Sequence, residues 1–355
     1  MSNPLVSICI PTHNRAEALR ASLEEVRRHE YEPLDILISD NASTDGTEDV
    51  CRQAAAADAR IRYVRQPRNI GLYGNHNFCL EASRGELLCF FHDHDERDRR
   101  MIRHYVDFLQ EHPTVGVVCS DWELIDDAGQ RIAVRDYRAK EVTPGLAYIE
   151  QTIKSGQSAI GIPGAMVRRT ALADIRFDEQ GPTGFGDFVV WFQVAERWDV
   201  GHLPRRLWRW RQGRGALSAR TIESLTRDYE ESLTNYCHGY LARWPADTAR
   251  VARWRRYVRQ YLFWALAYEL GLHFRHGARR EHSWTQRQTL FEILDYRLSQ
   301  EQFHRVLELM DRYCTGAVQS GAFVLINLLM RLHLTWPLAL ATEHHAMFRD
   351  LLGLK

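Results

Sequence analysis

The chain has 355 residues, of which 45% are hydrophobic and 26% charged, and its formal net charge is zero. This length exceeds what one small core needs, so we expect two structural units, or one large domain with an appendage. The composition is that of a soluble globular protein, and the balanced charge creates no overall field that would indicate nucleic acid or a membrane as a partner.

The cysteines and the N-terminus indicate a reducing compartment. The chain has seven cysteines, which is an odd number, and no two of them have C-x-x-C spacing. We therefore expect free thiols in a cytoplasmic protein, with no disulfide framework and no zinc knuckle. The first residues, MSNPLVSICIPTHNR, lack a basic stretch followed by a long apolar one, so we expect no signal peptide. The most apolar late segments, 261–274 and 321–330, are too short to span a bilayer.

The first 125 residues alternate between apolar runs and helix-like segments. The apolar runs are 5–10, which is rich in β-branched residues, and 34–39, 61–66, 86–91 and 115–120. The helix-like segments are 16–29, 46–57, 74–83 and 98–111. Nearly continuous apolar strands separated by helices predict an α/β fold with a mostly parallel sheet that is covered on both faces.

The pattern is looser from 121 to 215. Here we expect a turn at 126–131, a strand approached through glycines at 161–169, a helix from about Asp187 and a basic extended segment at 202–211. After about residue 220 only helical periodicity remains. We therefore predict an α/β domain over 1–220 and an α-helical region over 221–355.

Three expected strands end in polar clusters: PTHNR at 11–15, SDNASTDGT at 39–47 and HDHDE at 92–96. Parallel sheets bind ligands beyond the carboxyl ends of their strands. In an extended segment Asp93 and Asp95 would point the same way. Since Mg²⁺ typically takes one or two carboxylates plus phosphate oxygens, the pair indicates a metal-bound diphosphate. The alternative is that these acids only cap the following helix.

Polar residues at the other two strand ends have side chains suited to a nucleoside. Asp40 can accept hydrogen bonds from a base or ribose. Thr12 and Asn14 have side chains suited to contact with the base or with backbone. The alternatives are an Asx-turn for Asp40 and capping of the first helix for Thr12 and Asn14.

Four segments together resemble the family 2 glycosyltransferases of the GT-A fold, in order and spacing, over roughly residues 4–215. They are VSICIPTHNRAEALRASLEEV, ILISDNASTDGT, RNIGLYGNHNF and GELLCFFHDHDE. The resemblance implies transfer of a sugar from a nucleotide diphosphate donor to a hydroxyl, with inversion at the anomeric carbon and with Mn²⁺ or Mg²⁺ as the metal.

The resemblance also assigns residues. Asp93 and Asp95 match the family's D-x-D motif, with Asp95 on the metal and Asp93 by the ribose or the metal's waters. Gly71 would let the backbone approach the nucleotide closely. The residues expected to bind the donor are Pro11, Thr12, Asn14, Asp40, Gly71, Asn75, Asp93 and Arg211.

The family's general base is an acidic residue that opens a late helix, commonly within a Glu-Asp pair. Asp187 holds that position here, and Gly186 replaces the glutamate. Asp187 alone can take the proton of the acceptor hydroxyl. The alternative is that Asp187 is an N-cap. The next candidates for the base are Asp121 and Glu179.

Two further departures from the family pattern concern the metal and the diphosphate. His92 precedes the D-x-D motif, so a His-Asp-His-Asp string at a transition-metal site is an alternative, although alternation would turn its histidines away from the aspartates. Gln212 stands where a metal-binding histidine is often found. Arg209, Arg211 and Arg214 could instead clamp the diphosphate, or form a solvated loop.

Residues 243–280 contain nine arginines and two acidic residues, interleaved with aromatics. The segment either packs as a helical bundle, including in a homo-oligomer, or lies on an anionic membrane surface, which would suit a lipid-linked acceptor. Basic residues with aromatics can also hold nucleic acid. Nothing else in the chain supports nucleic acid as a partner. The expected location is cytoplasmic, either free or peripheral on the inner face of the cell membrane.

The function that these features predict is that of a metal-dependent, inverting glycosyltransferase in bacterial surface glycan synthesis, such as capsule or O-antigen, acting on a glycan or lipid-linked glycan. One alternative is a nucleotidyltransferase, but no Gly-rich phosphate loop follows the first strand. The other is a catalytically silent relative that binds a sugar nucleotide or serves as a scaffold.

Overall fold

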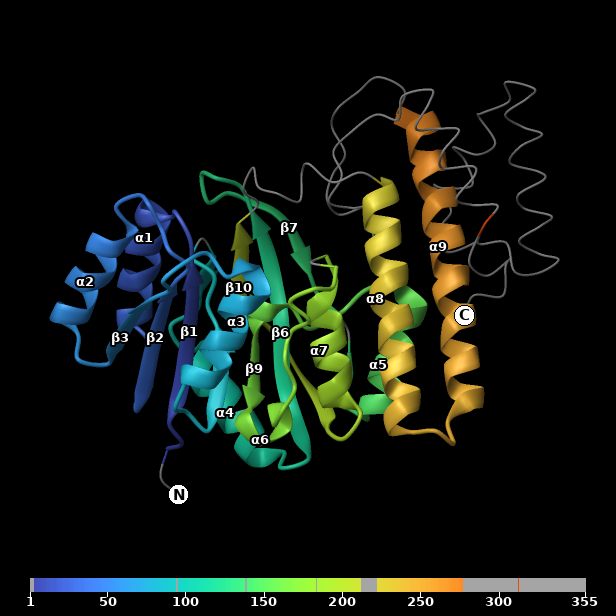
Figure 1. The fold of residues 1–355 in the computed structure, drawn as a ribbon, viewed down its shortest axis with the longest axis horizontal. Coiled ribbons are helices and arrows are strands. Elements are labelled where there is room, and N and C mark those ends of the chain that lie inside the picture. The colour runs from blue at the N-terminus through green and yellow to red at the C-terminus, as the bar shows by residue number, and fades with distance from the viewer. Residues whose placement is uncertain are drawn as a thin grey trace. The chain divides into compact units, whose positions relative to one another are not determined.

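The computed structural model describes residues 3–93, 95–137, 139–182, 184–211, 222–276 and 312 (Figure 1). The chain divides into two compact units. The first comprises Met1–Ile149 and Ser158–Gly213, and the second comprises Glu150–Gln157 and Arg214–Lys355. The division into a catalytic domain over 1–220 and a helical region over 221–355 remains a proposal about function.

The first unit contains a sheet with the strand order β3-β2-β1-β4-β9-β6-β10-β5. Its parallel half consists of β1 (Val6–Thr12), β2 (Leu34–Asp40), β3 (Ile61–Arg65) and β4 (Leu87–Phe90). β9 (Ala165–Arg168) is antiparallel and lies between β4 and β6 (Val115–Ile125), and β6 pairs in parallel with β10 (Asp199–Arg211). The predicted mostly parallel α/β fold is confirmed.

Short strands complete the sheet at its edges. β5 (Glu96–Arg97) and β8 (Val142–Thr143) pair antiparallel with β10, and β7 (Arg131–Arg135) pairs with β6. The helices of this unit are α1 (Ala16–Arg27), α2 (Thr47–Ala57), α3 (Gly71–Ala82), α4 (Met101–Glu111), α6 (Arg169–Leu172) and α7 (Gly186–Ala195), with a 3₁₀ turn at Ile162–Gly164. Helix α5 (Gly145–Ser155) begins in this unit, and its residues from Glu150 onward are assigned to the second.

Both faces of the parallel half are covered, which explains its nearly unbroken apolar strands. Along β1, Val6, Ile8 and Ile10 belong to the core shared with α1, α2 and α4. The alternate residue Cys9 lies on the other face, where its thiol donates to the carbonyl oxygen of Cys79 in α3. The cysteines in the described part of the chain are free and buried.

The second unit contains a helix pair, α8 (Ile222–Arg243) and α9 (Thr248–His276). Trp254 of α9 is fully buried and packs on Tyr236 and Tyr240 of α8, with ring centroids 6.0 and 4.8 Å away. At least this aromatic residue of the basic segment therefore serves helix packing. Residues 277–280 lie outside the described part. Among the described helices, none has the length and apolar character needed to cross a membrane.

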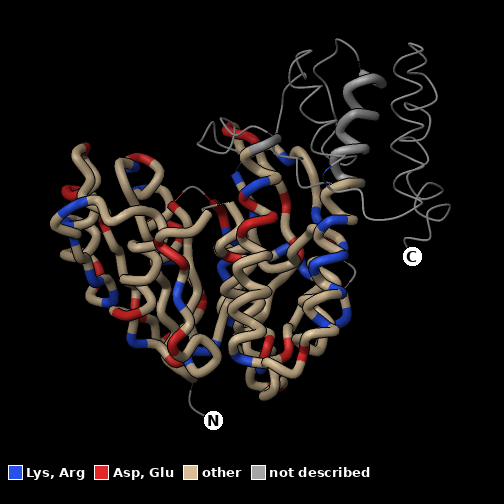
Figure 2. Tube along the Cα trace, turned by 45° about the vertical axis from the view of Figure 1, so that its right-hand side comes forward, with Lys and Arg blue, Asp and Glu red and all other residues tan. Residues whose placement is uncertain are grey.

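Charge is mixed over the described chain: Figure 2 shows basic and acidic residues interspersed along it. This agrees with the zero net charge of the sequence.

Gly85, between α3 and β4, is required by a close approach of backbone. A Cβ there would lie 2.4 Å from the Ser7 amide nitrogen and 2.7 Å from the Leu87 carbonyl oxygen. We expect Gly85→Ala to lower the free energy of unfolding by about 1–3 kcal/mol, since backbone must move to relieve the clash. Urea denaturation measures this. Gly239→Ala, in the interior of α8, is the control and should not destabilise the protein.

Candidate functional site

The ends of β1, β2 and β4 meet at the carboxyl edge of the sheet. Thr12 is paired with Asp40 across β1 and β2, and Cys9 is paired with Phe90 across β1 and β4. This register brings the residues after β4 level with the end of β1. The hydroxyl of Thr12 accordingly donates to a carboxylate oxygen of Asp93 at 2.8 Å. Two of the residues predicted to form the site are thus in contact.

The loop after β1 is fastened to the loop after β2 by Asn14. Its backbone has a φ of 53°, in the left-handed region that asparagine tolerates. The side-chain oxygen of Asn14 accepts from the Thr44 amide at 2.7 Å, and the backbone amide of Asn14 donates to the Ser43 hydroxyl at 2.9 Å. Asn14 therefore shapes the predicted nucleoside side of the site by joining two loops. Pro11, one residue before the end of β1, is paired with Ser39.

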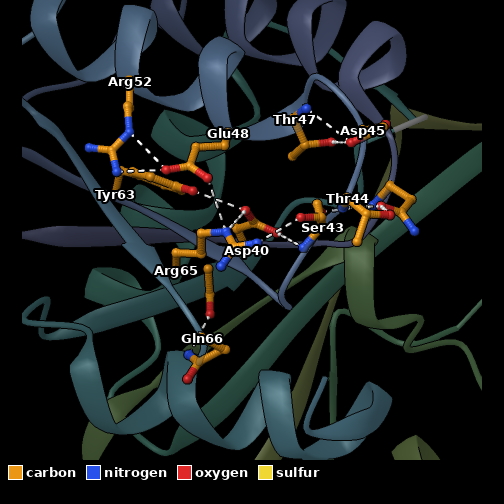
Figure 3. Close-up of polar contacts among 12 residues, drawn as sticks. Asp40, Ser43, Thr44, Asp45, Thr47, Glu48, Arg52, Tyr63, Arg65 and Gln66 are labelled. Carbon is orange, nitrogen blue, oxygen red and sulfur yellow. Dashed lines mark hydrogen bonds and ion pairs between the residues drawn. The ribbon is translucent and has the colours of Figure 1, made fainter. Parts of the chain in front are cut away.

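Asp40 is fully buried, and its carboxylate is engaged within the protein (Figure 3). One oxygen accepts from the Ser43 amide at 2.9 Å, which is the Asx-type turn considered above. The other accepts from the Tyr63 hydroxyl at 2.9 Å and lies 3.7 Å from the guanidinium of Arg65. Burial and the hydrogen bond to Asp40 raise the pKa of Tyr63, so its hydroxyl stays a donor. In this structure Asp40 ties the β2 loop to β3.

Arg65 extends the same network. It donates to the Ser43 carbonyl oxygen at 2.8 Å and lies 3.2 Å from Glu48. Figure 3 includes Arg65, Ser43 and Glu48 among its labelled residues. Arg65 thus binds the carbonyl oxygen of Ser43 and Asp40 binds its amide, so that together they fix the loop at Ser43. The observed contacts of Asp40 are thus internal ones that shape this loop, and its contact with a nucleoside stays a prediction.

The start of α3 is open at Gly71. Gly71 has a φ of +80°, and a Cβ built there would meet no atom within 4 Å. Asn41 fixes this turn by accepting from the Ile70 amide at 2.8 Å and donating to the Gly71 carbonyl oxygen at 3.1 Å. Sequence reasoning did not single out Asn41, although its place after Asp40 in an Asx-rich loop is a signal for such a role. The open space is consistent with the predicted close approach of a ligand to Gly71.

Asn75 of α3 is buried, and both ends of its amide contact Ser39 of β2. The nitrogen donates to the Ser39 carbonyl oxygen at 3.0 Å, and the oxygen accepts from the Ser39 hydroxyl at 2.5 Å. Asn75 therefore holds α3 to β2. Direct donor contact by this residue is still only a prediction, and the observed contacts favour a supporting role.

The acidic segment after β4 is a turn. β4 ends at Phe90, Asp93 lies in the turn, and the Asp95 amide is 3.4 Å from the His92 carbonyl oxygen. The argument from strand alternation was therefore wrong. In particular, His92 does not point away from the aspartates, because its Nδ1 lies 4.0 Å from a carboxylate oxygen of Asp95. His94 lies outside the described residues.

Asp93 and Asp95 are both buried, and they offer carboxylate oxygens at the edge of the sheet. A pair of carboxylates suits Mg²⁺ or Mn²⁺, which also take water and phosphate oxygens. Within the described residues, no cluster of three histidine, cysteine or acidic side chains is arranged to bind a metal. Two carboxylates are a donor set that a hard cation such as Mg²⁺ or Mn²⁺ prefers. The transition-metal alternative also needs His94, which lies outside the described residues.

A buried arginine, Arg97, holds the acidic turn through its backbone. Its guanidinium donates to the carbonyl oxygens of His92 and Asp95, both at 3.1 Å, and lies 4.1 Å from the ring centre of Phe91. It is also 3.8 Å from Glu25, whose pKa burial raises to about 7, against the opposing effect of Arg97. The sequence did not reveal this role, because an arginine in a charged segment is usually solvated.

Arg211 is held by the protein on both its backbone and its side chain. Its amide donates to Asp95 at 3.1 Å, and its guanidinium pairs with Glu96 and donates to the carbonyl oxygens of Asp126 and Asp127 at 2.9 Å. Arg209 also pairs with Glu96, at 2.6 Å. A diphosphate clamp by these arginines would require exchange of Glu96 for phosphate. Gln212 and Arg214 lie outside the described residues.

Asp187 opens α7, as predicted. Although part of its surface is exposed, loss of solvent around the carboxyl group raises its pKa to about 7, against the lowering effect of backbone hydrogen bonds such as that from the Phe188 amide at 3.0 Å. Within the described part of the chain, only backbone amides donate to this carboxyl group.

The two other candidates for the base have side-chain partners. Asp121 is buried and accepts from His202 and from the Tyr137 amide, both at 2.9 Å. Glu179 accepts from Asn77 at 2.9 Å. Asp187 is therefore the candidate whose carboxyl group receives hydrogen bonds from backbone amides alone among the described residues.

Known proteins with similar sequences include glycosyltransferases. Residues 7–176 match the family model described as glycosyl transferase family 2. The chain is 28% identical to an uncharacterised protein, MT1568, of Mycobacterium tuberculosis over 48% of this chain and 56% of the relative. It is 29% identical to the putative glycosyltransferase EpsE of Bacillus subtilis over 56% of this chain and 76% of the relative.

A shorter match, 33% identical over 26% of this chain, is to a Campylobacter jejuni enzyme named GalNAc(5)-diNAcBac-PP-undecaprenol beta-1,3-glucosyltransferase. The chain spans 30% of that enzyme's length.

Solved structures share the fold. TarS 1–349 of S. aureus, in complex with UDP-GlcNAc, has a TM-score of 0.57 at 16% identity, with 98% of this chain and 92% of that chain covered. The mannosyltransferase PcManGT of Pyrobaculum calidifontis, in complex with GDP-Man and Mn²⁺, has a TM-score of 0.54 at 15% identity, with 99% and 88% covered. These likenesses confirm the predicted GT-A fold. Over residues 7–176, a little under half of its length, the chain is therefore similar to glycosyl transferase family 2, and it resembles glycosyltransferases in sequence and fold.

Proposed function

We propose that this chain is a metal-dependent, inverting glycosyltransferase that moves a sugar from a nucleotide diphosphate donor to a hydroxyl group. The observation that carries the proposal is the contact between Thr12 and Asp93, which joins two family motifs at the carboxyl edge of the sheet. Ligands of open α/β sheets bind at this edge.

Asp187 is the proposed general base. A base works best when its pKa lies near the working pH, and burial raises the pKa of Asp187 to about 7. In the reaction its carboxylate takes the proton of the acceptor hydroxyl as the oxygen attacks the anomeric carbon, and the bond from that carbon to the diphosphate breaks. The electrons of that bond leave with the diphosphate.

Asp93 and Asp95 are the proposed holders of Mn²⁺ or Mg²⁺. When bound, the cation offsets the negative charge that develops on the leaving diphosphate. Arg97 keeps the turn in place through the carbonyl oxygens of His92 and Asp95. Arg211 contributes its amide to Asp95, and its guanidinium is proposed to turn toward phosphate only after it leaves Glu96.

The donor is proposed to lie against the loops after β1, β2 and β3. Pro11, Thr12, Asn14 and Gly71 would border it directly, while Asp40 and Asn75 would shape these loops from inside. A nucleotide sugar is supported by the UDP-GlcNAc and GDP-Man bound to the two solved neighbours, and manganese by the Mn²⁺ in one of them.

The acceptor is proposed to be a glycan or a lipid-linked glycan in the synthesis of a bacterial surface polymer. Relatives support this through their names, which include an undecaprenol-linked glycan and teichuronic acid biosynthesis. A cytoplasmic enzyme at the inner face of the membrane would meet such an acceptor. The basic segment 243–280 would provide membrane contact, whereas packing or homo-oligomerisation is its other proposed role.

A second candidate function, a catalytically silent binder of sugar nucleotides, is favoured by one observation. Gly186 stands where the family commonly has a glutamate, so one carboxylate near the proposed base is absent. Slow hydrolysis of the donor in the presence of Mn²⁺ would separate an enzyme from a silent binder.

A thermal-shift screen of nucleotide sugars tests the proposal. We expect one donor to stabilise the protein in the presence of Mn²⁺ and much less in the presence of a chelator. At a ligand concentration 100 times Kd the gain is about 2.7 kcal/mol. The free nucleoside serves as the control for binding without the diphosphate. If no donor stabilises the protein with either Mn²⁺ or Mg²⁺, the proposal is wrong.

A further inference from the structure

One face of α3 holds the loop that leads into α7. Asn77 donates to the carbonyl oxygen of Phe177 at 2.9 Å and accepts from its amide at 2.8 Å, so the backbone of Phe177 is bound on both sides. The ring of Phe177 stacks on that of Tyr73, with centroids 5.1 Å apart and planes at 15°. Since Tyr73 and Asn77 are four residues apart, they lie on the same face of α3.

The hydroxyl of Tyr73 reaches the first residue of α7. It accepts a hydrogen bond from the Gly186 amide at 3.1 Å. The first amides of a helix have no carbonyl partner within the helix, and they need an acceptor when they are buried. Phe185, at the N-cap position, makes no side-chain capping bond. Tyr73 therefore supplies from α3 the acceptor that a capping side chain would otherwise provide.

Tyr73 also explains why residue 186 is a glycine. A Cβ on Gly186 would lie 2.5 Å from the Tyr73 hydroxyl oxygen and 2.6 Å from two of its ring carbons. Real side chains do not approach so closely, and Tyr73 is buried and stacked on Phe177, so it cannot easily move. A glutamate at 186 is incompatible with Tyr73 in this place.

We propose that Tyr73 is a positioning residue for Asp187: its hydroxyl fixes the start of α7 and thereby the direction of the adjacent carboxyl group. This inference rests on the proposed role of Asp187 as the general base. In this chain the tyrosine from α3 occupies the space beside Asp187 that a side chain at position 186 would otherwise fill.

Tyr73→Phe tests the role of the hydroxyl, because phenylalanine keeps the stacking on Phe177. We expect kcat to fall by about 10- to 100-fold, since displacement of a catalytic group by about 1 Å has effects of this size. The KM for the donor should stay unchanged. The midpoint of the pH–kcat profile should move below its wild-type value, because the freed Gly186 amide and entering water both favour the ionised carboxylate.

Tyr31→Phe is the matched control. Tyr31 is also buried, and its hydroxyl donates to the Pro4 carbonyl oxygen at 2.6 Å, next to the amino end of β1. Both variants should lose similar stability, but Tyr31→Phe should keep the wild-type kcat and pH profile. If Tyr73→Phe behaves like this control, Tyr73 is only structural and the inference is overturned.

A double-mutant cycle tests the contact without any assay of activity. Gly186→Ala should destabilise the wild-type protein, and Tyr73→Ala should relieve most of this cost, which gives a coupling measurable by urea denaturation. Additive effects would contradict the steric part of the inference. If Asp187→Asn keeps normal transfer while the coupling is present, the assignment of the base fails and the contact between Tyr73 and Gly186 remains.

Discussion

Asp187→Asn is expected to lower kcat by about 10²- to 10⁴-fold and to leave donor affinity nearly unchanged. Asparagine keeps the size and the capping capacity of the side chain but cannot take a proton. The loss therefore falls on turnover. Single-turnover transfer, combined with calorimetric titration of the donor, separates the two effects.

The same substitution has a pH-dependent effect on stability, with a sign that can be worked out. Burial raises the pKa of Asp187 in the folded protein from 3.8 to about 7. Between these values the folded protein keeps a proton that the unfolded chain releases, so stability falls as pH rises toward about 7. Asp187→Asn removes this penalty. The variant should be more stable than wild type at pH 8, and this advantage should disappear near pH 4.

Wild-type kcat should rise with pH through about 7, because the base must be ionised. If Asp187 has only a structural role at the start of α7, Asp187→Asn should leave the chemistry intact, because asparagine keeps the capping capacity of aspartate. An Asp187→Asn protein with near-normal transfer would thus contradict the proposed base, and Asp121 would be the next residue to test.

The sequence predicted the elements whose signal is local. The runs that became β1 to β4 and the first half of β6 are apolar and end at clear breaks, and the glycines before Asp187 mark the start of α7. The pairing of β9 between β4 and β6 was not predicted, because local patterns do not determine which distant strands pair. Helix α5 was missed in the segment where periodicity weakens.

The site shows the same limit at the level of side chains. Asp40 allowed both a nucleoside contact and an Asx-turn, and its contacts with the distant Tyr63 and Arg65 could not be read from the local sequence. His92 was misplaced because alternation applies to extended backbone, whereas the chain turns there. Arg97 and Tyr73 could not be predicted, since each acts through contacts with segments far along the chain.

Asp95→Asn is expected to abolish the part of donor affinity that depends on Mn²⁺. Substitution of groups that only support a metal ligand typically costs about 10- to 100-fold in metal affinity, so loss of a direct carboxylate ligand should cost at least about 100-fold. Donor affinity in the presence of a chelator should be unchanged. Calorimetric titration of the donor with Mn²⁺ and with chelator measures both quantities.

Asparagine is a better probe than alanine because Asp95 is part of a buried network. Its carboxylate accepts from the Arg211 amide at 3.1 Å and lies 3.9 Å from the buried guanidinium of Arg97. Alanine would remove the acceptor as well as the charge, whereas asparagine keeps an oxygen for Arg211. Some stability should still be lost, since Arg97 loses the nearby negative charge. The titrations therefore need a temperature at which the variant is folded.

Asp35→Asn is the matched control for Asp95→Asn. Asp35 is also buried and pairs with an arginine, Arg62, at 2.7 Å, but it lies near the amino end of β2, away from the acidic turn. Its substitution should cost stability and leave the Mn²⁺ dependence of donor binding as in wild type. If Asp95→Asn binds the donor with undiminished Mn²⁺ dependence, Asp95 only anchors the turn through Arg211 and Arg97. The metal would then have to be held by Asp93 together with the phosphates of the donor.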